Sequence, residues 1–358
     1  MLIVKTIIFT DGKSIIYTTN MVADNCEKIL NLITFNILRT ILNQFYSMNV
    51  KKCNFAVLKM KNEMKLTVAP GLPAIARLRG EGLTQICGRP ADVRALKLLV
   101  VNLMPKKPET ECDLLRMLSA AQKSVDVTFA LPDGHVSAHT AAEHIAQYYI
   151  GIDEAMRHDW DGMIVTGAPL DFVEYEDVRY WTQICRLLDW SREHVRSTMW
   201  VCWGAFAALY HRYGINKFPL DRKISGVYSH MLIHPEHDLM CGMNPDIRVP
   251  HSRHVAVDVK QVINTPALAV LAYSAEAGAY LIAEHDSRDI MVFGHPEYNA
   301  MTLHGEYVRD LGKGMNPHIP DHYYPHDDPA QTPLNCWSEH AAQLYCNWIS
   351  RLVAPQQA

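Results

Sequence analysis

The sequence predicts an α/β protein in which a parallel β-sheet is flanked by helices. Between residues 96 and 213, short apolar runs of strand length alternate with longer amphipathic segments. This alternation is typical of a parallel sheet that helices cover on both faces. Ligands of such sheets bind at the carboxyl ends of the strands, so residues that follow a strand are the first candidates for a functional site.

The expected elements follow one another along the chain. Strands are predicted where apolar residues run continuously or alternate, and helices where they recur every three to four residues. The predicted strands are 96–104, 125–130, 161–166, 198–202 and 290–293. The predicted helices are 109–121, 141–149, 178–194, 204–213, which Gly214 ends, and 337–352. The segment 321–333 is rich in Pro, His and Asp, and is expected to form an ordered loop over the core.

The composition changes sharply near Met64. Residues 1–63 contain no His, Trp or Pro, although the whole chain has 18, 7 and 19 of them. The first segment is therefore either a small appended region, with a helix near 23–46, or upstream sequence translated from an early start. We favour the early start. We assign no chemistry to 1–63 and expect all of it in a domain spanning 64–358.

Composition and charge exclude several classes of protein. The formal net charge of −4 provides no basic field that would hold nucleic acid. No apolar run approaches 18 residues, so no membrane span is expected. The opening stretch lacks a secretory apolar region, because Asp11 interrupts it early. The 9 cysteines are odd in number and show no CxxC pair, which indicates reduced thiols in the cytoplasm.

Histidine is plentiful, so a metal site has to be considered. Two sets of histidines cluster along the chain, but Pro320 and Pro325 prevent the second set from lying on one helix. No adjacent pair of cysteines provides the spacing of a structural zinc site. We therefore expect no required metal. The two sets are His230, His234 and His237, and His318, His322 and His326.

Cys202 is the first candidate for catalysis. It ends an apolar strand and precedes a helix, in the stretch WVCWGAFAAL. A tight turn between strand and helix places the side chain at the edge of the sheet and directs the helix N-terminus at the sulfur, which favours the reactive thiolate. The backbone N–H of Trp203 is a candidate donor to an oxyanion. Taken alone, a buried and inert cysteine is the more common case.

His295 and Glu297 form the second candidate group, in IMVFGHPEY. In extended backbone, residues i and i+2 project to the same side. Glu297 is thus able to hold the imidazole in one tautomer while His295 faces a nucleophile, which is the arrangement of a catalytic triad. The alternative is a solvated histidine in a turn.

Together these stretches resemble the homoserine O-acyltransferases, also called homoserine transsuccinylases or transacetylases. The resemblance covers residues 70 to 352, and its motifs recur in order. The matching stretches are NLMPKKPETE (102–111), VTGAPL (165–170), VCW (201–203), AAL (207–209), KISGVY (223–228), PHSR (250–253), GHPEYNAMTL (294–303) and YYPHDDP (323–329). The resemblance implies a flavodoxin-like fold, similar to the class I glutamine amidotransferases.

The resemblance also implies roles for particular residues. The acyl-thioester cysteine falls on Cys202, the base on His295 and the third member of the triad on Glu297. Contacts to the amino-acid substrate fall on three further residues, namely Lys223, Ser252 and Arg309. The cations suit a substrate carboxylate, which Arg grips bidentately, and the hydroxyl suits its polar end. The implied reaction moves an acyl group from acyl-CoA, as co-substrate, to the hydroxyl of L-homoserine in methionine biosynthesis, without a bound cofactor.

Two positions leave the chemistry open. Lys107 follows a strand and would either attract the CoA phosphates or stabilise the oxyanion. Asp171 falls where the family position that influences acyl-CoA choice lies, at which succinyl-CoA users are expected to have Gly and acetyl-CoA users Glu. Two like charges 4 Å apart repel by about 4 kcal/mol at an effective dielectric near 20. An ionised Asp171 therefore favours acetyl-CoA over succinyl-CoA.

Several alternatives remain on the sequence alone. The first alternative is an L-serine O-acyltransferase of cysteine synthesis. L-serine is one methylene shorter than homoserine, and one methylene provides only about 1–3 kcal/mol of discrimination between substrates. A glutamine amidotransferase uses the same Cys, His and Glu, but its G-x-C-x-G elbow is altered here, since Trp200 replaces the first glycine. The third alternative is a binding protein that has this fold but no catalytic activity. The resemblance further implies a homodimer.

Overall fold

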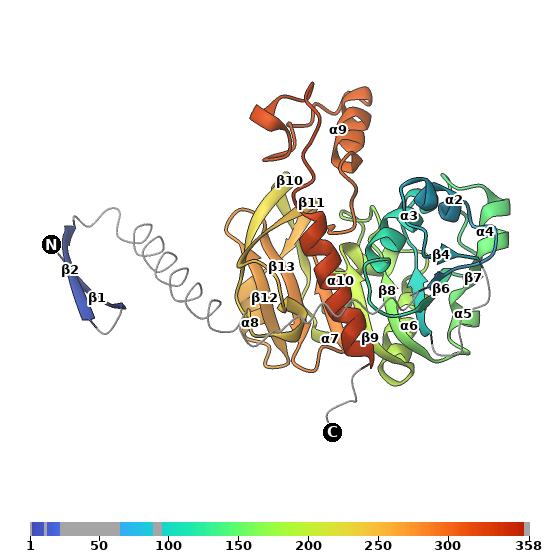
Figure 1. The fold of residues 1–358 in the computed structure, drawn as a ribbon, viewed down its shortest axis with the longest axis horizontal. Coiled ribbons are helices and arrows are strands. Elements are labelled where there is room, and N and C mark those ends of the chain that lie inside the picture. The colour runs from blue at the N-terminus through green and yellow to red at the C-terminus, as the bar shows by residue number, and fades with distance from the viewer. Residues whose placement is uncertain (1, 11–12, 22–64, 89–94, 354–358) are drawn as a thin grey trace. The chain divides into compact units, whose positions relative to one another are not determined.

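A computed structural model of the chain is shown in Figure 1. It describes residues 2–10, 13–21, 65–88 and 95–353. The chain divides into two compact units, Met1–Phe55 and Ala56–Ala358. In the first unit, β1 (Leu2–Thr10) pairs antiparallel with β2 (Lys13–Met21). The helix that the sequence predicts near 23–46 lies outside the described residues.

The second unit is built on one mixed sheet of 12 strands. Its order is β11-β10-β12-β13-β14-β9-β8-β5-β6-β3-β4, and β7 pairs with β6. The strands that pair in parallel are β3 (Leu66–Thr67), β4 (Ile86–Cys87), β5 (Leu96–Val101), β6 (Val125–Leu131), β7 (Tyr149–Gly151), β8 (Trp160–Val165), β9 (Val195–Val201) and β14 (Asp289–Val292). The predicted α/β class with a parallel sheet flanked by helices is confirmed.

Four antiparallel strands extend this sheet beyond the part that the sequence predicts. They are β10 (Lys217–Leu232), β11 (Asp246–Val257), β12 (Leu268–Ser274) and β13 (Gly278–Glu284). β13 pairs antiparallel with β14, and β10 and β11 form the outer hairpin, whose register shifts between Pro219 and Ile224. The parallel centre of the sheet thus continues into an antiparallel wing.

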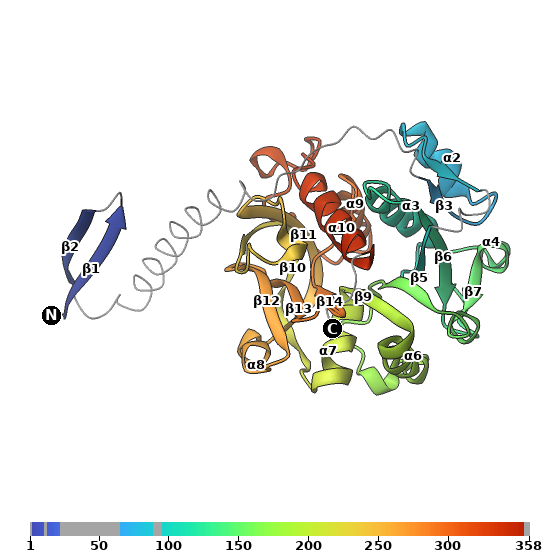
Figure 2. The same ribbon diagram turned by 60° about the horizontal axis from the view of Figure 1, so that its bottom comes forward.

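Helices cover both faces of the sheet, as Figure 2 shows. Alternate side chains of a strand point to opposite faces. On one face, Leu98 and Val100 lie in an apolar cluster with residues of α3 and α10, and on the other face Leu99 and Val101 lie in a cluster with α6 and α7. The helices are α2 (Pro73–Gly80), α3 (Lys107–Leu118), α4 (Ala142–Tyr148), α5 (Ile152–Ala155), α6 (Trp181–His194), α7 (Trp203–Tyr213), α8 (Val259–Ile263), α9 (Thr302–Gly312) and α10 (Ser338–Val353).

Three adjacent parallel strands end together at one edge of the sheet. Val165 of β8 pairs with Trp200 of β9, and Val201 of β9 pairs with Val292 of β14. The chain segments that follow these strands therefore start side by side. They carry Gly167, Cys202 and His295, respectively, so the order of the strands brings the predicted catalytic residues to one place.

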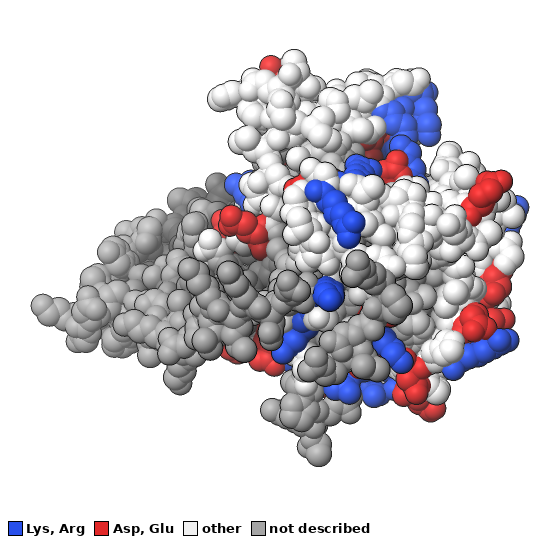
Figure 3. All heavy atoms as spheres, turned by 45° about the vertical axis from the view of Figure 1, so that its right-hand side comes forward, with Lys and Arg blue, Asp and Glu red and all other residues white. Residues whose placement is uncertain are grey.

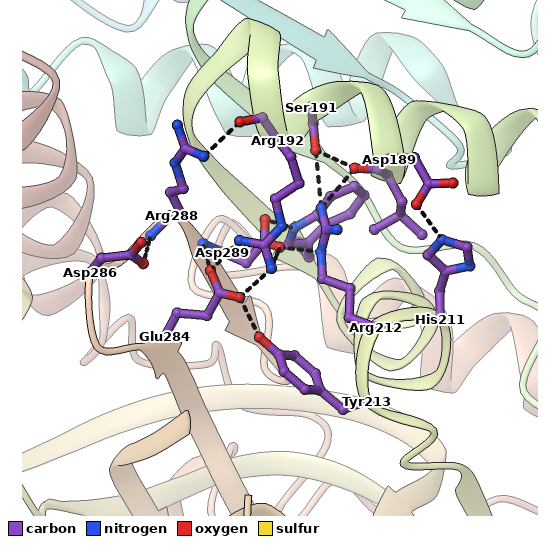
Figure 4. A network of polar contacts seen from close by, with 12 residues as sticks. Asp189, Ser191, Arg192, His211, Arg212, Tyr213, Glu284, Asp286, Arg288 and Asp289 are labelled. Carbon is purple, nitrogen blue, oxygen red and sulfur yellow. Dashed lines mark hydrogen bonds and ion pairs between the residues drawn. The ribbon is translucent and has the colours of Figure 1, made fainter. Parts of the chain in front are cut away.

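The opposite ends of these strands are held by a network of charged side chains (Figure 4). Asp289, at the start of β14, is buried and accepts a hydrogen bond of 2.8 Å from the indole of Trp200. Arg212 of α7 and Arg192 of α6 form ion pairs with the same carboxylate. Glu284 of β13 accepts hydrogen bonds from Arg192 and from Tyr213. A buried carboxylate needs such partners, and here they tie α6 and α7 to the sheet.

The segment 321–333 is an ordered loop, as the sequence predicts. Asp321 bridges to Gly226 of β10, and Tyr323 and Tyr324 are buried in a small cluster with Trp337. None of the helices among the described residues is long and apolar enough to cross a membrane. On the face shown in Figure 3, basic and acidic side chains are interspersed.

Candidate active site

Cys202 lies at the junction of β9 and α7, where it is the N-cap residue of the helix. Its backbone has φ 50° and ψ −115°, a conformation that a residue other than glycine seldom adopts. Its amide donates a 2.7 Å hydrogen bond to the carbonyl of Val292, which fixes the turn against β14. The thiol is thereby held at the positive end of α7, and the first N–H groups of that helix have no acceptor within it.

His295 and Glu297 lie on the segment that follows β14. The Nδ1 of His295 is 2.7 Å from Oε1 of Glu297, and both side chains are buried. The amide of His295 donates to Pro250 of β11 at 2.8 Å. A Cβ on Gly294 would lie 2.6 Å from Val249 Cγ1, so only glycine allows this close crossing of β11.

The imidazole of His295 is hydrogen-bonded on its other side to Cys202. Since Nδ1 is engaged by Glu297, Nε2 is the nitrogen that remains for the thiol. Burial alone would lower the pKa of His295, but the negative charges of Cys202 and Glu297, with the hydrogen bonds to both, raise this pKa well above its usual value. The site therefore favours a proton on the imidazole.

Gly167 lies against these two residues, although the sequence marks it only as part of the VTGAPL stretch. A Cβ at this position would lie 3.0 Å from Cys202 Cβ, 3.4 Å from its Sγ and 3.6 Å from Cε1 of His295. The glycine thus leaves the space in front of the sulfur open. A side chain at this position would press against both Cys202 and His295.

Tyr298 connects the triad to a second group of polar residues. Its ring stacks on the imidazole of His295, with ring centroids 4.2 Å apart and planes inclined by 13°. Its hydroxyl donates a 3.0 Å hydrogen bond to Oε1 of Glu306 on α9. Neither Tyr298 nor Glu306 was identified from the sequence. A carboxylate near the start of a helix after the GHPEYNAMTL motif is the only signal for Glu306.

Two of the predicted substrate-contact residues meet at Glu306. Ser252 donates a 2.5 Å hydrogen bond to Oε2 of Glu306, and the ammonium of Lys223 lies 3.4 Å from the same oxygen and 3.7 Å from Oδ2 of Asp310. Arg309 is half-exposed on α9 and forms an ion pair of 2.8 Å with Asp310. A pocket of about 200 Å³ opens beside Lys223 and Asp310.

Asp171 lies outside this cluster, on the loop after β8. Its Oδ2 accepts a 2.7 Å hydrogen bond from the backbone amide of His254 on β11. The ring of His254 contacts that of Phe172, at 5.0 Å between centroids, and also lines the pocket beside Lys223. The position predicted to influence donor choice is thus fixed to the same strand that carries Ser252.

Lys107 and Trp203 are both completely or almost completely buried. The ammonium of Lys107 donates to the carbonyls of Asn102 and Met104, at 2.8 and 3.2 Å. Burial lowers its pKa to about 8, although the charge of Glu111 opposes this shift. The indole of Trp203 packs in the apolar cluster of α6 and α7, while its backbone N–H stays at the helix N-terminus beside Cys202.

The histidines of the two sequence clusters do not converge. His230 lies instead against His251, with their Nε2 atoms 3.1 Å apart, whereas His234 pairs with Glu236 and His322 with Glu276. Within the described ranges, no group of three or more His, Cys, Asp or Glu side chains is arranged to hold a metal ion.

The buried pair of His230 and His251 makes stability depend on pH. Burial lowers the pKa of His230 to about 3 and that of His251 well below its usual value. Below pH 6.5 the unfolded chain binds protons at these positions that the folded chain does not, so the free energy of unfolding falls as the pH is lowered. The expected slope reaches about 1.4 kcal/mol per pH unit for each histidine.

Urea unfolding between pH 7 and 5 measures this slope. A His230→Asn variant should lose part of it, while His158→Asn, which removes an exposed histidine, should leave it unchanged. An equal slope in wild type and in His230→Asn would show that the pair does not contribute.

Solved structures that align with this chain include glutamine amidotransferases. One from Thermotoga maritima aligns with a TM-score of 0.48 and 12% identity, covering 74% of this chain and 100% of that one. Another, from Methylobacillus flagellatus, aligns with a TM-score of 0.45 and 12% identity, covering 75% of this chain and 98% of that one.

Sequence comparison gives closer relatives. A homoserine O-acetyltransferase of Methanomethylophilus alvi (strain Mx1201) is 41% identical over 293 residues, covering 81% of this chain and 95% of the relative. A protein of the same name from Bacteroides thetaiotaomicron is 40% identical over 293 residues, covering 81% and 96%. A model of the homoserine O-succinyltransferase family matches residues 65–358. Since this match covers every described strand and helix of the second unit, the chain belongs to the homoserine O-succinyltransferase family of acyltransferases.

Proposed function

We propose that this enzyme transfers an acyl group, preferably acetyl, from acyl-CoA to the hydroxyl of L-homoserine through a thioester on Cys202. The observation that carries the proposal is the buried contact chain of Cys202, His295 and Glu297 at the N-terminus of α7. A nucleophile, a base and an orienting carboxylate in hydrogen-bond contact are the requirements of covalent acyl transfer.

The first half-reaction loads the enzyme. The thiol proton of Cys202 passes to His295, and the thiolate attacks the thioester carbonyl of the donor. The resulting oxyanion is stabilised by the backbone N–H of Trp203 at the helix N-terminus. The bond from the acyl carbon to the CoA sulfur breaks, and the departing thiolate takes the proton from His295. Glu297 keeps the imidazole in the required tautomer and stabilises its charged form.

The second half-reaction unloads the acyl group onto the acceptor. His295, now neutral, takes the proton of the homoserine hydroxyl, and the oxygen attacks the thioester on Cys202. The bond to the sulfur breaks, and the sulfur regains a proton from His295. The product is an O-acyl-homoserine, and the kinetics are ping-pong.

The polar cluster around Glu306 provides the acceptor site. An amino-acid substrate carries an ammonium and a carboxylate, and each needs an opposite charge when it leaves water. Glu306 suits the ammonium, while Lys223 and Arg309 suit the carboxylate and Ser252 the polar end. Because Tyr298 contacts both Glu306 and His295, an acceptor bound at Glu306 lies beside the base.

Two roles were considered for Lys107, namely attracting the CoA phosphates and stabilising the oxyanion, and its surroundings favour the second. A fully buried ammonium that is bonded to two carbonyls does not reach CoA phosphates unless it moves. Its burial therefore favours an electrostatic role toward the oxyanion.

No metal is required by this mechanism, and acyl-CoA is a co-substrate rather than a bound cofactor.

Donor and acceptor preference are tested by initial rates. We expect kcat/KM to be larger for acetyl-CoA than for succinyl-CoA, because the ionised Asp171 repels a second carboxylate, and the relatives named homoserine O-acetyltransferase support this choice. The kcat/KM for L-homoserine should exceed that for L-serine by about 10- to 200-fold, because one methylene group has an effect of that size. A preference for succinyl-CoA would overturn the donor assignment, and a preference for serine would move the enzyme to cysteine synthesis.

The chemistry is proposed to lie entirely in residues 64–358, because the family match begins at residue 65. A chain that begins at Met64 should keep kcat/KM within about twofold of the full chain, since all the residues assigned to the site lie after that residue. Loss of activity, in a truncated protein whose circular dichroism shows it to be folded, would assign a role to residues 1–63.

The setting of the reaction follows from the same proposal. O-acyl-homoserine formation places the enzyme in methionine biosynthesis, and the reduced cysteines that the sequence predicts place it in the cytoplasm. A homodimer is proposed from the family resemblance, and light scattering of the purified protein tests it.

A further inference from the structure

Arg253 is a buried cation at the active-site edge of the sheet. It follows Ser252 on β11 and is only 2% exposed. β13 runs antiparallel to β14 with Leu281 opposite Val292, so the turn between β12 and β13 projects from the same edge as Cys202. The guanidinium of Arg253 donates to the carbonyl of Ala277 in that turn, and at 2.5 Å to that of Val255.

These two carbonyls do not balance the charge of the guanidinium. Arginine is seldom buried without a carboxylate, yet none of the ion pairs within the described ranges includes Arg253. Its Nε–H is buried without a hydrogen-bond acceptor among the described residues. Burial lowers its pKa to about 10, and the negative charges of Cys202 and Asp171 act in the opposite direction. Arg253 is thus charged at neutral pH, and its charge interacts with those of Cys202 and Asp171.

Asp171 is held beside the strand that carries Arg253. Its carboxylate is bonded to the amide of His254, the residue that follows Arg253 on the same strand. Arg253 and Asp171 are therefore tied to neighbouring residues of one strand, and the charge of Arg253 also interacts with that of Cys202. A second carboxylate on an incoming acyl group would have to compete with Asp171 for Arg253.

The structure assigns Arg253 as the second determinant of donor choice: the sum of its charge and that of Asp171, rather than Asp171 alone, decides whether an acyl group with its own carboxylate is accepted. This inference rests on the proposed function. With Asp171 ionised, the pair is neutral and suits an uncharged acetyl group. With Asp171 uncharged, the charge of Arg253 is no longer offset and attracts the distal carboxylate of a succinyl group.

A double-mutant cycle on the full-length enzyme tests the coupling. Asp171→Asn keeps an oxygen that accepts from the His254 amide and removes only the charge. The ratio of kcat/KM for succinyl-CoA to that for acetyl-CoA should rise by roughly tenfold or more. In an Arg253→Met background, the same Asn substitution should leave this ratio nearly unchanged. Glu174→Gln is the matched control, because it removes an exposed charge from the same loop and should not alter the ratio.

Arg253→Lys keeps the enzyme testable where the Met variant fails to fold, since it retains the positive charge. When Arg253→Lys is combined with Asp171→Asn, the ratio of kcat/KM for succinyl-CoA to that for acetyl-CoA should still rise. An equal gain from Asp171→Asn with Met or with Arg at position 253 would overturn the inference, as would the absence of any gain in the Lys background. If the wild-type enzyme forms no acyl-enzyme with either thioester, the proposed function fails instead, which separates the two outcomes.

Discussion

Replacing Cys202 with Ala should reduce kcat by roughly 10⁴-fold or more, because it removes the atom that carries the acyl group. The remaining groups would still bind both substrates. The hydroxyl of homoserine would then have to attack acyl-CoA directly, without the bond to sulfur that divides the reaction into two easier steps. Initial rates with acetyl-CoA and L-homoserine measure this loss.

The matched control is Cys112→Ala. Cys112 is another buried cysteine, on α3, and burial raises the pKa of its thiol to about 11, so it is mostly unreactive at neutral pH. This variant should keep kcat within about threefold of wild type. A Cys202→Ala enzyme that turns over at near-normal rate would contradict the covalent mechanism, whereas loss in both variants would point to a packing effect.

Replacing His295 with Asn should lower kcat by about 10²- to 10⁴-fold, the usual contribution of a general base. The buried imidazole is the group that accepts the proton of the thiol and later that of the acceptor hydroxyl. Both half-reactions should slow, so the single-turnover release of CoA and the transfer to homoserine should decline together. Rapid-quench measurements of the two steps check this expectation.

His254→Asn provides the comparison for His295. His254 lies near the site, and no hydrogen bond, ion pair or ring contact among the described residues joins its side chain to the triad. Its backbone amide, which holds Asp171, remains in the variant. We expect its kcat to change by less than about tenfold. The role given to His295 would be contradicted by a His295→Asn enzyme with kcat within tenfold of wild type and an unchanged pH profile.

The catalytic edge of the sheet could be predicted because it depends on local patterns. Short apolar runs mark β8, β9 and β14, and the residues that follow parallel strands must meet at one edge. Cys202 and His295 are such residues. The contact between His295 and Glu297 was expected from extended backbone, but the structure forms it in a turn, in which the amide of Tyr298 donates to the carbonyl of His295.

The antiparallel wing could not be predicted in the same way. β10 contains Pro219 and several charged residues, which hide the alternation that marks a strand. Lys223 and Ser252 were therefore placed only by the family resemblance, without their shared contact. Glu306 was missed because its role depends on α9 lying beside β10 and β11, a contact between segments far apart in the sequence. The burial of Arg253 was unforeseen, since arginine is usually exposed.

The most direct test of the central claim is intact-mass spectrometry of the enzyme after mixing with acetyl-CoA in the absence of an acceptor. Wild type should gain the mass of one acetyl group, located on Cys202 by peptide mapping, and adding L-homoserine should remove it. An enzyme that converts both substrates to product while its mass never changes, or that carries the acetyl group on another residue, would contradict the account.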